Sequence, residues 1–152
     1  DPSTKLILEI KKHATPQRET QVVEAILRLA REMRLVPQIE FISFSRHACD
    51  EVLRLQPDAV VVYVSSDMAA MSPAEAKKRG YGGLSYQLNV LMNRPELVDE
   101  ANRLGIATTL WMVNDCELID WAARHGITYV STDCPDKAEA YLEAVAAYKN
   151  KK

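Results

Sequence analysis

The sequence has few cysteines, and their placement argues against a disulfide-stabilised fold. Cys49, Cys116 and Cys134 are odd in number, lie far apart and form no CxxC pair. Small disulfide-rich domains instead carry an even number of cysteines within a short chain. We therefore expect the three thiols to be buried and chemically inert.

Long apolar runs and concentrated basic charge are also missing, which excludes two classes of partner. No apolar run approaches the length of roughly 20 residues that a membrane-spanning helix requires. The formal net charge is -2, and the densest basic run covers only residues 149–152, which suits a solvated chain end. We therefore expect neither a membrane span nor a nucleic-acid surface.

The first residues printed show neither a Met nor the pattern of a signal peptide. The segment DPSTK is not followed by the charged and then apolar pattern of a secretory signal. We expect the chain to begin at a cleavage or cloning boundary. The sequence does not select a compartment, so the bacterial periplasm and the cytoplasm both stay open.

What the sequence does contain is a regular succession of strand-like and helix-like segments. Each strand-like segment is short, and several are rich in branched apolar residues, as buried parallel strands are. Each is followed by a segment whose apolar residues recur at helical spacing. Strands are expected over residues 5–11, 38–43, 58–64, 83–87, 106–113 and 127–132.

Capping residues mark the helix boundaries between these strands. Thr15 and Pro16 predict the start of a helix that continues to about residue 33. Ser72 and Glu75 form a capping-box pattern at the start of a helix that ends at Gly80. Further helices are expected over residues 45–55, 95–104, 115–125 and 135–148.

Six strand–helix units of roughly 25 residues each predict an α/β domain with a parallel sheet. No linker divides the chain, so we assign residues 1–152 to one domain. An open doubly wound sheet and an incomplete TIM (β/α)8 barrel both fit, since a full barrel needs about 250 residues. Polar and aromatic residues follow most strand ends, where a barrel has its active site, and this favours the barrel. No glycine-rich loop follows the first strand, which argues against dinucleotide binding.

Glu9 and Lys11 are the first candidates for chemistry. Alternation along a strand places both on the face opposite Leu8, about 6.5 Å apart, and toward the interior of a barrel. Glu9 could bind a hard divalent cation through its oxygens, and Lys11 could bind a phosphate oxygen. The alternative is an internal Glu–Lys ion pair near the barrel mouth.

Two other residues near strand ends are weaker candidates on pattern alone. Trp111 could form an apolar wall for a substrate or belong to the core. His13 lies just beyond the first strand and is expected to be a solvated loop residue. Asp115 and Asp136 stand at helix starts, where carboxylates cap the helix, and Asp133 is expected to form a loop hydrogen bond.

Four segments together resemble the glycerophosphodiester phosphodiesterase family. LILEIKKH is similar to the family strand that ends in E-[IL]-K, and FISFS to the next strand. ATTLWMVND resembles the V-x-x-W-T-V-N strand, and ITYVSTDCPD the closing G-I-I-T-D-x-P-D strand. These segments occur in the family's order and span nearly the whole chain. The helix PELVDEANRLGI also fits the segment before the tryptophan strand.

The resemblance implies a (β/α)8 barrel that hydrolyses a glycerophosphodiester to an alcohol and glycerol 3-phosphate. The cofactor it implies is a divalent cation, commonly calcium or magnesium. By matching position, Glu9 corresponds to a metal-binding glutamate and Lys11 to the lysine near the phosphate. Trp111 corresponds to a tryptophan on the glycerol side, and Phe44 is a weaker candidate for the same pocket.

One departure from the family affects the expected activity. The family's catalytic histidine pair and its other metal-binding acids belong to motifs that this sequence does not contain. His13, His47 and His125 do not match them. The resemblance therefore equates the chain with barrel strands three to eight, and we expect the chain alone to be an inactive fragment.

Two alternatives to an enzyme fragment are kept open. A non-enzymatic half-barrel could act as a scaffold or binding module. Because it would expose two sheet edges, we expect it to self-associate or to pair with the missing N-terminal barrel segment. An unrelated open α/β domain is the other alternative, and strand order distinguishes it from a barrel fragment, in which the strands run sequentially.

Overall fold

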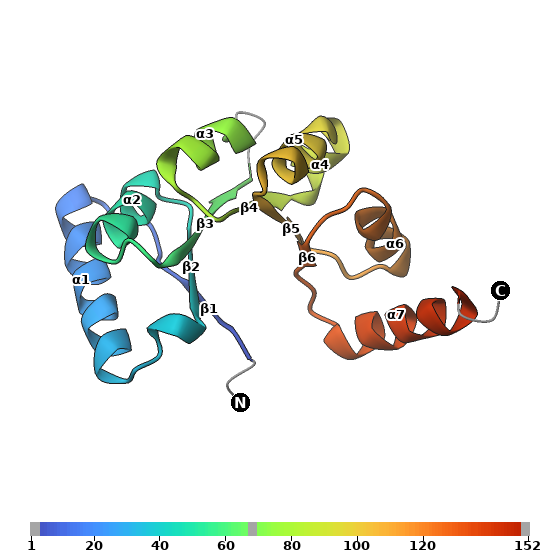
Figure 1. Ribbon diagram of the computed structural model, residues 1–152, viewed down its shortest axis with the longest axis horizontal. Coiled ribbons are helices and arrows are strands. Elements are labelled where there is room, and N and C mark those ends of the chain that lie inside the picture. Colours follow the sequence, from blue (N-terminus) through green and yellow to red (C-terminus); the bar gives the residue numbers. More distant parts are fainter. Residues whose placement is uncertain (1–3, 67–69, 150–152) are drawn as a thin grey trace.

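The computed structural model describes residues 4–66 and 70–149 (Figure 1). Its sheet has six strands, and every neighbouring pair is parallel. The order β1-β2-β3-β4-β5-β6 is strictly sequential, which rules out a doubly wound sheet and confirms the incomplete barrel. The strands are β1 (Leu6–Glu9), β2 (Ile39–Ser43), β3 (Val60–Ser65), β4 (Gly83–Gln87), β5 (Ala107–Trp111) and β6 (Tyr129–Val130).

The helices lie on the outer, convex side of the curled sheet (Figure 1). The sheet is open on the side where the N-terminal strand and the C-terminal helix lie. The helices are α1 (Pro16–Glu32), α2 (Arg46–Leu55), α3 (Pro73–Arg79), α4 (Leu88–Asn93), α5 (Glu96–Leu104), α6 (Cys116–Arg124) and α7 (Pro135–Lys149), with a 3-10 turn η1 (Val36–Gln38) before β2.

Thr15, Ser72 and Asp115 cap their helices as predicted, whereas Asp136 is not a cap but lies inside the first turn of α7, which begins at Pro135. The Thr15 hydroxyl accepts a hydrogen bond from the Arg18 N–H, and Asp115 accepts one from the Glu117 N–H. Such bonds satisfy N–H groups that have no partner inside the helix. At the other end of α3, Gly80 has φ +80°, a left-handed conformation that favours glycine.

Helix α4 was not predicted, because the sequence indicated a strand over residues 83–87 and no further helix before residue 95. Its six residues include Asn89 and Asn93, which are weak helix formers. The helix is stabilised instead by tertiary packing, since Val90 and Leu91 are almost completely buried. Pro95 then precedes α5, which begins at Glu96.

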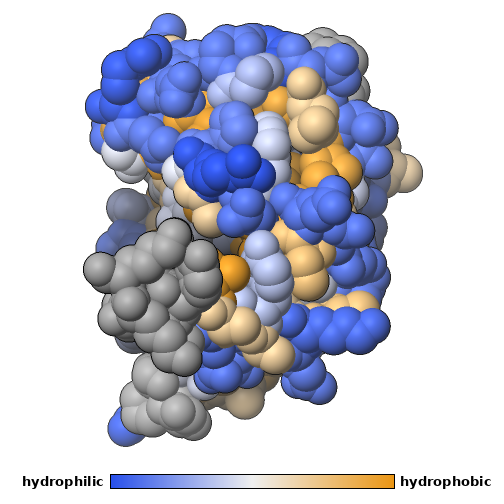
Figure 2. Space-filling model, turned by 90° about the vertical axis from the view of Figure 1, so that its right-hand side faces the viewer, coloured by the Kyte–Doolittle hydropathy of each residue, from blue (hydrophilic) through white to orange (hydrophobic). Residues whose placement is uncertain are grey.

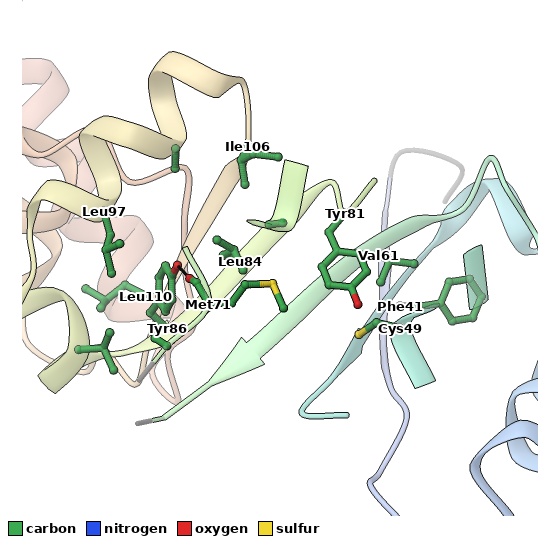
Figure 3. Packing of buried hydrophobic residues seen from close by; sticks show 14 of the residues in the cluster. Phe41, Cys49, Val61, Met71, Tyr81, Leu84, Tyr86, Leu97, Ile106 and Leu110 are labelled. Carbon is green, nitrogen blue, oxygen red and sulfur yellow. Dashed lines mark hydrogen bonds between the residues drawn. The ribbon is translucent and has the colours of Figure 1, made fainter. Parts of the chain in front are cut away.

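The main core lies between the sheet and its outer layer of helices (Figure 3). Alternate strand residues point outward into this layer, and full burial of one large apolar side chain contributes about 1.5–3 kcal/mol. Tyr86 is also buried there, and its hydroxyl donates a hydrogen bond to the Met71 carbonyl. Residues of the cluster include Phe41, Val61, Tyr81, Leu84, Leu97, Ile106 and Leu110.

The opposite, inner face of the sheet is only partly covered. Ile7, Val60 and Tyr129 on this face are 58%, 43% and 56% exposed. A hollow of about 330 Å³ opens between the first and last strands and is lined by Lys5, Glu40 and Tyr129 among others. The outer edges of β1 and β6 pair with no other strand of the described residues. The curvature of a barrel is thus present without its closure.

The side of the molecule that carries α6 and α7 is mostly hydrophilic (Figure 2). Hydrophobic residues reach the surface there only in patches between charged and polar ones. Helix α7 is held weakly: among its residues 135–146 only Ala138 is buried, and Leu142 is 47% exposed. None of the helices within the described ranges is long and apolar enough to cross a membrane.

Candidate active site

Three of the predicted site residues line one hollow at the carboxyl ends of the strands. Glu9 ends β1, Phe44 follows β2, and Trp111 ends β5. The hollow has a volume of about 230 Å³. The carboxyl ends of parallel strands lie at the same rim of a barrel, so Glu9 and Trp111, about 100 positions apart in sequence, both line this hollow. The remaining lining residues are Ile42, Val64, Ser85, Met112 and Ser131.

Lys11 lies beside this hollow and forms an ion pair with Glu9. The Lys11 Nζ and Glu9 Oε2 atoms are 2.8 Å apart, and their side chains are 74% and 29% exposed. The ion pair that the sequence left as an alternative is therefore present, but Lys11 is solvated rather than interior. An exposed pair of this kind contributes only about 0–1 kcal/mol. Breaking this ion pair therefore costs little free energy, so each of the two groups is available to bind a ligand instead.

An aromatic pair forms the apolar wall of the hollow. The rings of Phe44 and Trp111 meet edge to face, with centroids 6.0 Å apart and an interplanar angle of 88°. Phe44 is 40% exposed and Met112 is 44% exposed, so this wall is open to solvent. The Trp111 Nε1 atom is buried and has no hydrogen-bond partner among the described residues, although a buried indole N–H usually has one.

The predicted cation site is represented by one carboxylate. Among residues 4–66 and 70–149, no three His, Cys, Asp or Glu side chains are grouped so that they could hold a metal ion. Glu9 nevertheless offers the hard oxygen ligand that calcium and magnesium prefer, and magnesium sites often use only one or two protein carboxylates. The described residues thus fit one ligand of a shared cation site.

Asn114 connects two of the loops at the rim, a role that the sequence did not indicate. Its Oδ1 accepts hydrogen bonds from the Asp133 N–H at 2.8 Å and the Thr132 hydroxyl at 3.0 Å. Its Nδ2 donates to Asp133 Oδ2 at 2.9 Å. The expected loop hydrogen bond of Asp133 is therefore confirmed, and Asn114 is the partner that ties the loop after β5 to the loop after β6.

Glu19 is a second residue that the sequence did not single out. It stands in the first turn of α1 and is only 3% exposed. Its carboxylate accepts hydrogen bonds from the His13 N–H at 3.0 Å and from the Ser45 hydroxyl at 2.6 Å. A carboxylate in a first helical turn ordinarily indicates a favourable interaction with the helix dipole, so its burial could be found only from the fold.

The three histidines do not converge on the hollow. His47 shares a 3.0 Å hydrogen bond with the Thr20 hydroxyl, between α1 and α2. His125 contacts the Trp121 carbonyl within its own helix segment. His13 is half-buried and is held through its backbone by Glu19. None of them lines the hollow.

The cysteines differ from the expectation that all three would be buried. Only Cys49 is buried, whereas Cys116 is exposed and Cys134 is half-buried. Cys116 is the first residue of α6 and Cys134 directly precedes α7, so both lie near helix starts at the rim rather than in the core. Burial, followed by the nearby Asp50 and Glu19 carboxylates, raises the pKa of Cys49 to about 12.

Comparison with known proteins gives one family. Residues 3–137 match the glycerophosphoryl diester phosphodiesterase family. A curated relative, "Probable glycerophosphodiester phosphodiesterase 1" from Mycobacterium tuberculosis, is 28% identical over 101 residues, which cover 66% of this chain and 37% of the relative.

Solved structures show the same fold. A glycerophosphodiester phosphodiesterase from Parabacteroides distasonis superposes with a TM-score of 0.88 at 32% identity, over 93% of this chain and 58% of that one. A phosphodiesterase from Oleispira antarctica, in complex with the product sn-glycerol-3-phosphate, gives a TM-score of 0.75 at 18% identity, over 88% and 53%. The chain thus spans little more than half of these structures. On the family match and the shared half-barrel, the chain belongs to the glycerophosphoryl diester phosphodiesterase family.

Proposed function

We propose that this chain is the phosphate- and metal-binding side of a glycerophosphodiester phosphodiesterase whose barrel is completed by two further strand–helix units. One observation carries the proposal. Glu9, Phe44 and Trp111 line a single hollow at the carboxyl ends of the strands, with Lys11 beside Glu9. In (β/α)8 barrels this rim is where the active site forms. The product complex of the Oleispira antarctica relative indicates the class of ligand.

Each rim residue has a chemical role in this proposal. Phe44 and Trp111 pack against the glycerol carbons, because an apolar wall binds and orients the part of a substrate that carries no charge. Lys11 leaves its weak ion pair and donates to a phosphoryl oxygen, which stabilises negative charge as it develops. Glu9 would hold a calcium or magnesium ion in part, and that ion would supply further stabilisation of the charge.

Proton transfer is the function that this chain does not provide. Hydrolysis of a phosphodiester needs a base for the attacking group and an acid for the leaving alkoxide. His47 and His125 are bonded away from the hollow, and His13 does not line it. We propose that the completing units bring the histidine pair, so that the chain alone has no activity.

Fluorescence of Trp111 tests the binding part of this proposal. The chain has two tryptophans, so Trp121→Phe leaves Trp111 as the only tryptophan, whose emission is excited selectively at wavelengths that tyrosine does not absorb. Addition of glycerol 3-phosphate should shift or quench this emission saturably, and Lys11→Met in the same background should weaken the binding about tenfold or more. The matched control is Trp111→Phe, which keeps only Trp121 and should show no saturable change. An unchanged spectrum of the Trp111-only variant would contradict the proposed pocket.

A second candidate function, a self-associating half-barrel, is supported by the uncovered inner face. Ile7, Val60 and Tyr129 are exposed there, and β1 and β6 each offer a free backbone edge within the described residues. Exposed edges of parallel strands readily pair with other chains. We expect a concentration-dependent dimer or larger species by sedimentation velocity. A monomer that persists to millimolar concentration would contradict self-association.

A further inference from the structure

The segment that carries Lys11 is held at both ends by a buried polar network. Before Lys11, the Ile10 carbonyl accepts a hydrogen bond from the Ser43 hydroxyl at 2.7 Å. After it, the His13 N–H donates to Glu19 Oε1 at 3.0 Å. The first bond connects the end of β1 to β2, which is distant in sequence, and the second connects the loop after β1 to the first turn of α1.

Ser45 joins the two ends of this network. Its N–H donates to the Ser43 hydroxyl at 3.0 Å, and its own hydroxyl donates to Glu19 Oε2 at 2.6 Å. The same hydroxyl accepts the Ala48 N–H and so begins α2. Glu19 therefore bonds with both oxygens, one toward the Lys11 segment and one toward the start of α2.

The burial of the network makes these bonds hard to replace. Glu19 is 3% exposed, Ser43 1% and Ser45 6%. A buried carboxylate is costly unless its oxygens are bonded, and hydrogen bonds to a charged acceptor are roughly twice as strong as neutral ones. Water cannot easily take the place of Glu19 as the acceptor for the His13 N–H.

The Lys11 side chain, in contrast, is not fixed by its own contacts. It is 74% exposed, and its ion pair with Glu9 is of the weak surface kind. The position of its ammonium group therefore depends on where the backbone of residues 10–13 is held. A binding group on a fixed backbone loses less freedom on meeting its ligand than one on a mobile loop.

We propose that Glu19 is a positioning residue of this site, which fixes the backbone around Lys11 so that Lys11 is preorganised for a phosphoryl anion. The inference rests on the proposed function, in which Lys11 binds phosphate. Glu19 itself does not touch the ligand: it acts through the His13 N–H. A purely structural Glu19 would stabilise the fold without changing how strongly Lys11 binds an anion.

Substitutions of equal length separate the two roles. Glu19→Met removes both acceptors, whereas Glu19→Gln keeps one oxygen, which can still accept the His13 N–H. Glu24, an exposed glutamate on the same helix, gives the matched control Glu24→Met, which removes the same charge without touching the network. All variants are compared with wild type under conditions where urea titrations show them to be folded.

The measurement is a titration of the chain with inorganic phosphate, followed by the amide chemical shifts of residues 10–13. Wild type and Glu24→Met should bind with the same dissociation constant, and Lys11→Met should not bind. In Glu19→Met the constant should rise about tenfold, with faster hydrogen exchange at the His13 amide, and Glu19→Gln should restore it to within about threefold. If Glu19→Met does not fold, Ser43→Ala removes the hydrogen bond to the Ile10 carbonyl, while the Ile10 N–H keeps its bond to the Ile42 carbonyl, and the constant should rise about threefold.

The outcomes distinguish the inference from the function on which it rests. If wild type binds and Lys11→Met does not, but Glu19→Met and Ser43→Ala bind as wild type does, the positioning role is wrong and the proposed function stands. If wild type itself shows no saturable shifts, the phosphate role of Lys11 is wrong, and the positioning role is overturned with it.

Discussion

At the scale of single residues, the rim combines groups that are held with groups that are free. Glu19 and Asn114 each form hydrogen bonds to neighbouring loops through two side-chain atoms. Lys11 and Phe44 are exposed and have weak contacts. This division suits a binding site, in which the backbone is fixed and the groups that meet a ligand remain accessible.

Buried titratable groups predict a loss of stability at alkaline pH. Burial raises the pKa of Cys49 from 9.0 to about 12, and burial also raises the pKa of Tyr81 and Tyr86 above the usual tyrosine value. A group whose pKa is raised on folding contributes its full stabilisation at pH values below its unfolded-state pKa. This contribution is lost as the pH rises toward its folded-state pKa. We expect Cys49 alone to lower the free energy of unfolding by about 2 kcal/mol between about pH 8 and about pH 10.5.

Urea titrations at the two pH values check this expectation. Cys49→Ala should reduce the alkaline loss by about 2 kcal/mol relative to wild type, leaving the part due to the tyrosines. The matched control is Cys116→Ala, because that thiol is exposed, and its alkaline loss should equal that of wild type. Equal alkaline losses in wild type and Cys49→Ala would show that the Cys49 thiol is not shielded in solution.

At the scale of secondary-structure elements, the described helices differ in how firmly they are attached. Helices α1, α2, α3 and α5 bury apolar residues against the outer face of the sheet. Helix α7 has one buried residue among those at 135–146 and follows the two-residue strand β6. In a closed barrel the last helix would also pack against the first unit, which the described residues do not supply.

Hydrogen exchange should reveal this difference. We predict that the amides of α7 exchange at least 10 times faster than those of α2, because local opening of a helix with few buried apolar contacts costs little free energy. The measurement is native-state exchange followed by mass spectrometry of peptides. Helix α2 is the internal control, since it is buried at Ala48, Cys49 and Val52. Equal protection of α7 and α2 would mean that α7 is anchored by another surface, such as a second copy of the chain.

The order of the elements follows from local signals, and this part of the fold could be predicted from the sequence. Capping by Thr15, Ser72 and Asp115 and the left-handed Gly80 are properties of a few neighbouring residues. Helix α4 could not be predicted in the same way, because it depends on tertiary burial of Val90 and Leu91, which outweighs weak local preference.

Only the part of the candidate site that strand alternation determines could be predicted from the sequence. Alternation placed Glu9 near Lys11, and the structure pairs them at 2.8 Å. It could not show that Lys11 would be solvated, since exposure depends on what covers the inner face. Glu19 was missed for a related reason: Ser45 is brought to it only by the packing of α1 beside α2, and the His13 N–H reaches it only through the shape of the loop before α1.

At the scale of the whole molecule, the half-barrel accounts for the shape of the sheet and, in the proposed function, for a site that further units complete. Six sequential parallel strands curve as in a barrel and leave two strand edges free in the described chain. The hollow at their carboxyl ends contains a carboxylate and an aromatic wall but no complete metal site among the described residues. Completion of the sheet and completion of the site are therefore expected to occur together.

Restored catalysis is the most direct test of this account. The chain is assayed on glycerophosphocholine with calcium or magnesium, alone and after fusion to the two N-terminal strand–helix units of a family relative. We predict no turnover by the chain alone, metal-dependent release of glycerol 3-phosphate by the fusion, and a loss of about 100-fold in kcat/KM when the fusion carries Glu9→Gln. The matched substitution Glu24→Gln should leave the activity unchanged. Metal-dependent turnover by the chain alone, or a folded fusion that stays inactive, would contradict the account.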